Sequence, residues 1–171
     1  METSLILSCL LLANVWAYSE LLVFSDLKTT KMTSPYQQNV VYSDFHQLHE
    51  ANVLGKEPQW LWYEHGQGKK ATFEAFLYSY CPQVTAYLVI RADDYFTAQV
   101  NDKAVGTGTN YGTVYTLPLK LQCGLNKLTI FARNGGGPGA VIFKVIQDTS
   151  RCYKCVGSGF YNYDTCSCQC S

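Results

Sequence analysis

Two adjacent acidic residues, Asp93 and Asp94, interrupt a stretch that otherwise alternates between polar and apolar side chains. Paired carboxylates can hold a metal ion, take part in acid–base chemistry, or accept hydrogen bonds from the backbone of a turn. In a straight strand successive side chains point to opposite faces, so these two carboxylates converge only where the backbone turns. The chemistry of the pair therefore depends on the elements and loops that surround it.

The surrounding sequence predicts an all-β fold. Apolar residues recur at every second position in three segments: Ala86, Leu88 and Ile90; Leu128, Ile130 and Ala132; and Val141, Phe143 and Val145. Alternation of this kind, with aromatic and β-branched residues and closely spaced turn signals, is typical of a β-sandwich. One or two helical turns are expected only between Ser43 and Gly55, where Ser43 is a candidate N-cap and Gly55 a candidate stop.

The order of strands and turns predicts which loops meet at one end of the sandwich. If successive strands run in opposite directions, four loops gather at the end that carries Asp93 and Asp94, namely residues 64–70, 92–95, 106–112 and 134–139. A tight turn is expected at Asn101 and Asp102, residue types that tolerate positive φ. The same directions place Cys81 and Cys123 together at the opposite end, where they form the first expected disulfide.

Charge and the N-terminal sequence indicate where the protein acts. Lys plus Arg and Asp plus Glu each number 13, which argues against a nucleic-acid partner or a polybasic membrane patch. The apolar run from Leu5 to Val15 has the length of a signal-peptide core and is too short to span a bilayer. Cleavage after Ala17 is expected. We therefore predict a secreted, extracellular protein with no membrane span.

The cysteines carry a second prediction. Loss of the signal peptide removes Cys9, which leaves 8 − 1 = 7 cysteines. In a secreted chain these are expected to form disulfides, and an odd number leaves one for another molecule. We expect a disulfide-linked homodimer or a crosslink to another matrix protein, without assigning the pairing within the tail. The cysteines concerned are Cys81, Cys123, Cys152, Cys155, Cys166, Cys168 and Cys170.

Part of the chain resembles a known family. The segments WLWYEHG, ATFEAFLYS, AYLVIRADDYFTAQVND and GLNKLTIFARNGGGPGAVIFKV resemble galactose-binding-domain-like jelly rolls, in particular the accessory modules found beside rhamnosidases. The resemblance covers Gln59 to Gln147 and implies a jelly-roll β-sandwich with a small disulfide-rich tail. The expected organisation is a signal peptide at residues 1–17, a segment of strand and short helix at 18–55, the sandwich at 56–149 and the cysteine-rich tail at 150–171.

Three roles for the aspartate pair stay open. Yeast flocculin-type sugar binders, whose sandwiches this one resembles, share a calcium ion between adjacent aspartates, which implies a calcium site at Asp93 and Asp94. Alternatively, one carboxylate caps its turn while the other pairs with Arg91 or a lysine. In the third case the carboxylates contact a sugar directly. Apart from this calcium alternative, no cofactor is expected.

The resulting functional hypothesis is a secreted, non-catalytic, lectin-like module that binds glycan or matrix polysaccharide through the loops at one end. Neither a nucleophile motif nor a second paired acid points to an enzyme. The alternative is a structural extracellular matrix or coat protein crosslinked through its cysteine tail. The candidate ligand-binding residues are Asp93, Asp94, Tyr95, Asn110, Tyr111 and Asn134.

Overall fold

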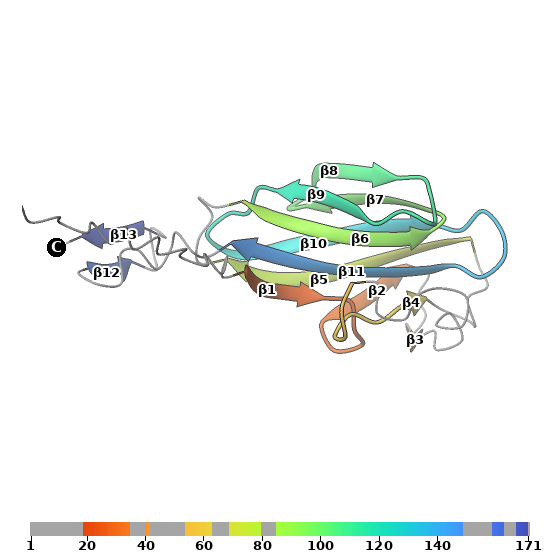
Figure 1. The fold of residues 1–171 in the computed structure, drawn as a ribbon, viewed down its shortest axis with the longest axis horizontal. Helices are drawn as coiled ribbons and strands as arrows, with labels where there is room; N and C mark the ends of the chain where they lie inside the picture. Colours follow the sequence, from red (N-terminus) through yellow and green to blue (C-terminus); the bar gives the residue numbers. More distant parts are fainter. Residues whose placement is uncertain are drawn as a thin grey trace, which may run out of the picture.

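A computed structural model of the 171-residue chain describes residues 19–34, 40–41, 54–62, 69–79, 85–148, 159–162 and 167–170. These residues contain no helix and form two antiparallel sheets in two layers, together with a separate two-stranded sheet (Figure 1). The predicted all-β sandwich is therefore confirmed. The helical turns expected between Ser43 and Gly55 lie outside the described residues, apart from Leu54 and Gly55.

The strand order of both layers combines residues that are far apart in the sequence. The first sheet has the order β3-β4-β11-β6-β9, with β1 also paired to β11, and the second has the order β2-β5-β10-β7-β8. The strands of the first sheet are β1 (Ser19–Phe24), β3 (Val40–Val41), β4 (Leu61–Trp62), β6 (Ala86–Asp93), β9 (Tyr115–Leu119) and β11 (Ala140–Asp148). Those of the second are β2 (Thr30–Ser34), β5 (Lys70–Ser79), β7 (Tyr95–Val100), β8 (Lys103–Gly108) and β10 (Gly124–Arg133).

Strands from the N-terminal segment complete both sheets. The sequence analysis began the sandwich at residue 56, whereas β1 pairs with β11 and β2 pairs with β5. Each of these two pairings contains a register shift, which breaks the period-two pattern by which strands are found in a sequence.

The core lies between the two sheets and follows the predicted alternation. The apolar residues predicted at every second position of β6, β10 and β11 are all buried in it. A smaller cluster of Leu54, Trp60, Ala140 and Ile142 covers the other face of the first sheet. Because β11 is buried on both faces, its sequence reads as a nearly continuous apolar run.

The tight turn between β7 and β8 forms where the sequence predicts it. Asn101 and Asp102 have φ values of 51° and 62°, the left-handed region that a two-residue hairpin requires. The Asn101 side chain also donates to Asn126 Oδ1 at 2.9 Å and accepts from the backbone N of Lys127 at 2.9 Å. These bonds tie the hairpin to β10.

The register of the pairs confirms the predicted strand directions. Ser79 lies opposite Gly124, and at the other end Lys70 lies opposite Arg133, which in turn lies opposite Tyr95. Cys123 is disulfide-bonded and is located at the Ser79 end, while Cys81 lies outside the described residues. The Cys81–Cys123 pairing therefore stays a prediction.

The described part of the cysteine-rich tail is a hairpin. β12 (Gly159–Asn162) pairs only with β13 (Ser167–Cys170), which contains Cys168 and Cys170. Cys152, Cys155 and Cys166 lie outside the described residues. Within the ranges that the structure describes, there is no helix of the length and apolarity needed to cross a membrane.

Candidate functional site

Two connections cross between the sheets beside each other at the right-hand end of Figure 1. In the first, Asp93 ends β6 in one sheet and Tyr95 begins β7 in the other, and the Asp93–Asp94 peptide bond is cis. The second is the loop of residues 134–139, which joins β10 to β11. Because Ala140 pairs with Asp93 and Arg133 with Tyr95, the loop lies next to the aspartates. Asp93, Asp94 and residues 134–139 are called the crossover site.

The two carboxyl groups of the crossover site face each other. A side-chain hydrogen bond joins Asp93 to Asp94, which requires that one of the two carboxyl groups carries a proton. Asp94 also contacts the loop, where its Oδ2 accepts a hydrogen bond from the backbone N of Gly135 at 2.6 Å. The pair is therefore one acidic unit fastened to the neighbouring connection.

This arrangement changes the acidity of Asp93. Its pKa is raised from 3.8 to about 7, first by burial, then by the hydrogen bond with Asp94 and by repulsion from the Asp94 charge. The positive charge of Arg91 acts in the opposite direction. In the absence of metal, burial and the neighbouring Asp94 therefore favour the protonated form of Asp93 more than in an exposed aspartate.

The side chain of Asn134 shapes the loop of the crossover site. It is buried, and its Nδ2 donates to the carbonyl O of Gly137 at 2.7 Å while its Oδ1 accepts from the backbone N of Gly136 at 2.9 Å. Gly137 has a φ of +75°, which favours glycine there. Gly139 packs against Trp62 so closely that a Cβ would come within 2.7 Å of the indole ring. The loop is thus held in one shape before any ligand arrives.

Arg91 contacts the predicted loop of residues 106–112. Arg91 donates from Nε to the carbonyl O of Tyr111 at 2.7 Å, and its guanidinium carbon lies 5.7 Å from the centre of the Trp60 ring. Asn110 uses its side-chain oxygen within its own turn, accepting from the backbone N of Gly112 at 2.9 Å. The ring of Tyr111 is exposed.

Of the six predicted residues, Asp93, Asp94 and Asn134 share the crossover site. Tyr95 lies next to it and faces the outer side of the second sheet, where the guanidinium carbon of Arg133 is 5.8 Å from the centre of its ring. Asn110 and Tyr111 belong to the neighbouring loop. The sequence analysis treated Arg91 only as an ion-pair partner and missed Gly135, whose contribution is a backbone N–H that no side-chain pattern reveals.

The donor set of the crossover site suits a hard cation. Among the residues that the structure describes, no cluster of three or more His, Cys, Asp and Glu side chains could hold a metal. The site instead offers two carboxylates and the backbone carbonyls of the loop, whose shape the Asn134 side chain fixes. Calcium takes six to eight oxygen ligands of these kinds, whereas zinc and other softer metals favour nitrogen and sulfur. The residues present fit calcium, with water or ligand oxygens completing the shell.

Comparisons with known proteins find partial structural likenesses. No family model matches the sequence, and no curated protein matches it. Over 51% of this chain and 28% of the other, it is similar to a lectin of Pleurotus ostreatus, with 30% identity and a TM-score of 0.45 for the apo form and 29% and 0.45 for the complex with GalNAc. A PA14 sugar-binding domain from an RTX adhesin shows 20% identity and a TM-score of 0.37 over 51% of both chains.

A third likeness, to the secreted serine protease VesC of Vibrio cholerae, has 15% identity and a TM-score of 0.41 over 67% of this chain and 25% of that one. This chain therefore spans little more than a quarter of the lectin and about a quarter of the protease. Since one sandwich fold hosts many functions and all these TM-scores are below 0.5, function has to be argued from the crossover site itself.

Proposed function

We propose that this protein is a secreted, non-catalytic carbohydrate-binding protein whose crossover site holds a calcium ion and, through it, a saccharide. The observation that carries the proposal is the convergence of the Asp93 and Asp94 carboxyl groups beside a loop that Asn134 and Gly135 hold in place. Two neighbouring carboxylates, one of which has a raised pKa in the absence of metal, are a suitable pair of ligands for a divalent cation. The cation replaces the proton and removes the repulsion between the charges.

The saccharide part of the proposal follows from the coordination that calcium needs. Two carboxylates and the oxygens of one loop leave part of a six- to eight-oxygen shell to be filled from outside. Neighbouring hydroxyl groups of a sugar ring are suitable outside ligands. The exposed ring of Tyr95, beside Gly135, offers flat apolar surface for the carbon face of a sugar, and the exposed ring of Tyr111 lies on a neighbouring loop. The role is one of binding, in which the carboxylates act as ligands.

The two other roles of the aspartates differ in what they predict. Asp94 already accepts a hydrogen bond from a backbone N–H, as the capping role requires, but that N–H belongs to Gly135 in another loop. In the capping role, loss of the carboxylates lowers stability in the absence of any ligand. In the direct sugar-contact role, binding survives removal of calcium.

One set of measurements separates these roles. Calorimetry should show calcium binding to the purified protein, and a glycan array should show binding that EDTA abolishes. Both activities should be lost in Asp93→Asn and Asp94→Asn. Asp102→Asn serves as the matched control, because it removes one exposed carboxylate from the turn at the opposite end of the sandwich.

Glycan binding that persists in EDTA, with no calcium binding, would replace the proposal with direct sugar contact. If neither ligand binds, and the two aspartate variants melt far below the control, the carboxylates serve the loop structure alone.

A further inference from the structure

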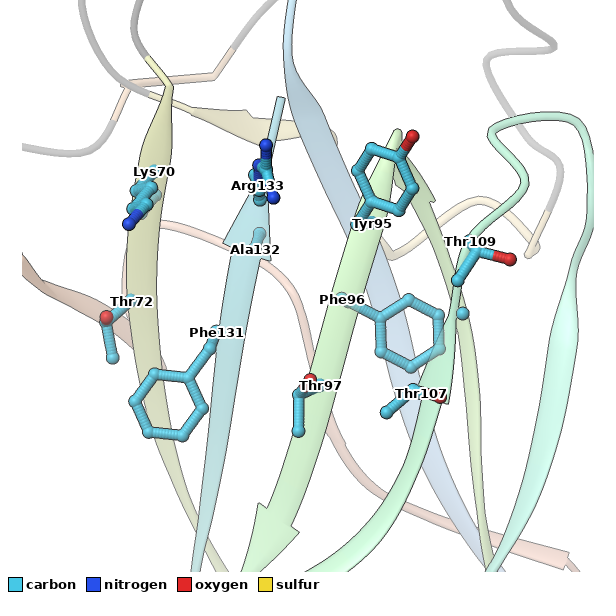
Figure 2. Close-up of a pocket in the computed structure, with 12 residues that line it drawn as sticks. Lys70, Thr72, Tyr95, Phe96, Thr97, Thr107, Thr109, Phe131, Ala132 and Arg133 are labelled. Carbon is cyan, nitrogen blue, oxygen red and sulfur yellow. The ribbon is translucent and has the colours of Figure 1, made fainter. Parts of the chain in front are cut away.

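The outer face of the second sheet contains a groove whose lining shares Tyr95 alone with the residues of the proposed function. The groove has a volume of about 480 Å³ and lies over the strands β5, β10, β7 and β8, at the same end as the crossover site (Figure 2). This volume falls within the range of small-molecule sites in proteins. Tyr95 lines the groove and also lies beside Gly135, so its ring separates the groove from the crossover site.

The side chains of the groove form two rows across neighbouring strands. The first row contains Lys70, Arg133 and Tyr95, which lie directly opposite one another on β5, β10 and β7. The second row contains Thr72, Phe131, Thr97 and Thr107 on β5, β10, β7 and β8. Because residues two apart on a strand share a face, the rows are adjacent. Figure 2 shows Lys70 and Arg133 above Phe131, with threonines on both sides of its ring.

The first row places two positive charges, Lys70 and Arg133, on adjacent strands. Among the described residues, no carboxylate forms an ion pair with Lys70 or Arg133, whereas Lys127, lower on β10, is paired with Asp102 at 3.1 Å. The chain as a whole has a formal net charge of 0, so this pair of cations is a local feature. A guanidinium and an ammonium on adjacent strands suit a carboxylate or sulfate group.

The side chains of the second row are suited to contact a sugar ring. Phe131 is 42% exposed at the centre of the sheet, where an apolar side chain gains nothing from solvent. An exposed aromatic ring offers a flat surface to the carbon face of a sugar, and the threonine hydroxyl groups beside it both donate and accept hydrogen bonds. A peptide could not add a strand at β5, β10 or β7, because these three strands are paired on both sides.

We propose that this groove binds an acidic saccharide, with its carboxylate or sulfate group between Lys70 and Arg133 and its ring against Phe131. The groove shares the carbohydrate class of ligand with the proposed function, but none of its contacts depends on calcium. Its ligand is therefore expected to bind in EDTA, where the crossover site is empty of metal.

The test uses the full-length secreted protein in EDTA and compares dextran sulfate, oligogalacturonate, neutral dextran and poly-glutamate by biolayer interferometry. Dextran sulfate carries sulfate groups and oligogalacturonate carries carboxylates, so these two probes show which anion binds. Neutral dextran is the control for an uncharged sugar backbone. Dextran sulfate or oligogalacturonate should bind, and neutral dextran should not. Because EDTA leaves the crossover site without metal, binding measured under this condition is independent of the proposed calcium-dependent function.

Matched variants locate the binding. Lys70→Gln/Arg133→Gln should lower affinity by roughly five- to thirtyfold, because the binding free energy of two solvent-exposed ion pairs is lost. Lys31→Gln/Lys120→Gln removes the same charge from outside the groove and should change affinity less than about twofold. Phe131→Leu keeps an apolar side chain but removes the flat ring, and should lower affinity by several-fold. Thermal melting of each variant identifies any that fail to fold.

Three outcomes would overturn the proposal. In the first, no acidic polysaccharide binds. In the second, the control pair loses as much affinity as the groove pair, so that the attraction is diffuse. In the third, poly-glutamate binds as well as the polysaccharides and Phe131→Leu has no effect, which assigns the groove to acidic protein segments.

Discussion

The carboxylate oxygen Oδ2 of Asp94 lies 2.6 Å from the backbone nitrogen of Gly135, a residue that follows it by 41 positions in the sequence. This hydrogen bond joins two connections that each pass from one sheet to the other at the same end of the sandwich. It fixes the direction of one carboxylate of the pair. A ligand that binds both carboxylates therefore meets a site that is already assembled.

The first prediction tests that hydrogen bond. A Cβ at Gly135 would lie 2.9 Å from Asp94 Oδ2, so Gly135→Ala forces the carboxylate aside. Calcium affinity should fall by about tenfold, the effect of losing one charge-assisted contact, while the melting temperature changes little. Calorimetry measures the affinity.

Gly136→Ala is the control for this prediction, because nothing lies within 4 Å of a Cβ at that position. It should leave calcium affinity unchanged and stability unchanged or higher by up to about 1 kcal/mol. Equal affinities in both variants would show that the position of the Asp94 carboxylate is irrelevant to calcium.

The second prediction concerns pH in the absence of metal. The pKa of Asp93 is raised from 3.8 to about 7 in the folded protein, first by burial, so between these values the folded state holds a proton that the unfolded state has lost. Its contribution to stability is therefore fully present below about pH 4 and is lost as the pH rises through 7. Above that pH it does not change further.

Melting curves in EDTA from pH 4 to 8 measure this contribution as the difference between the wild type and Asp93→Asn. The asparagine does not titrate, so the wild type should lose stability relative to the variant as the pH rises from 4 to 7. A difference that stays constant across this interval would contradict a raised pKa at Asp93.

The third prediction is the disulfide between Cys81 and Cys123. Cys123 is disulfide-bonded at the end of the sandwich where Ser79 pairs with Gly124, and Cys81 follows Ser79 by two residues. The bond would close a loop of about 40 residues and stabilise the fold by about 3–4 kcal/mol in the chain-entropy model. Peptide mapping under non-reducing conditions should recover the two cysteines in one crosslinked fragment. A fragment that joins Cys123 to the tail would contradict it.

The fourth prediction is a covalent homodimer of the secreted protein, or a crosslink to another matrix protein. With Cys81 and Cys123 joined, five cysteines of the tail remain, and five cannot all pair within one chain. In an oxidising compartment the remaining thiol is expected to form a disulfide with another molecule. Gels of the secreted protein should show a species of higher mass that reductant removes. A monomer in both lanes with one titratable thiol would contradict the prediction.

Much of the sandwich was predictable because its strands alternate. The residues assigned to the core in β6, β10 and β11 are buried, and the turn at Asn101 and Asp102 adopts the positive φ values that its residue types favour. Counting strand directions was enough to place Asp93 and residues 134–139 at one end. Strand was expected within residues 18–55, but the pairing of β1 and β2 into the two sheets was not predicted, because their register shifts break the alternation.

By itself, the sequence determined the fold class, the direction of the main strands and the presence of two adjacent acids at a strand end. These properties follow from local patterns, since burial of one face imposes a period of two on every strand. Only the tertiary structure decided that the carboxyl groups of Asp93 and Asp94 meet, and that Gly135 donates to one of them. It alone also placed Lys70, Arg133 and Phe131 on one groove. The reason is physical: these contacts join strands and loops distant in sequence, and the register between strands sets their distances.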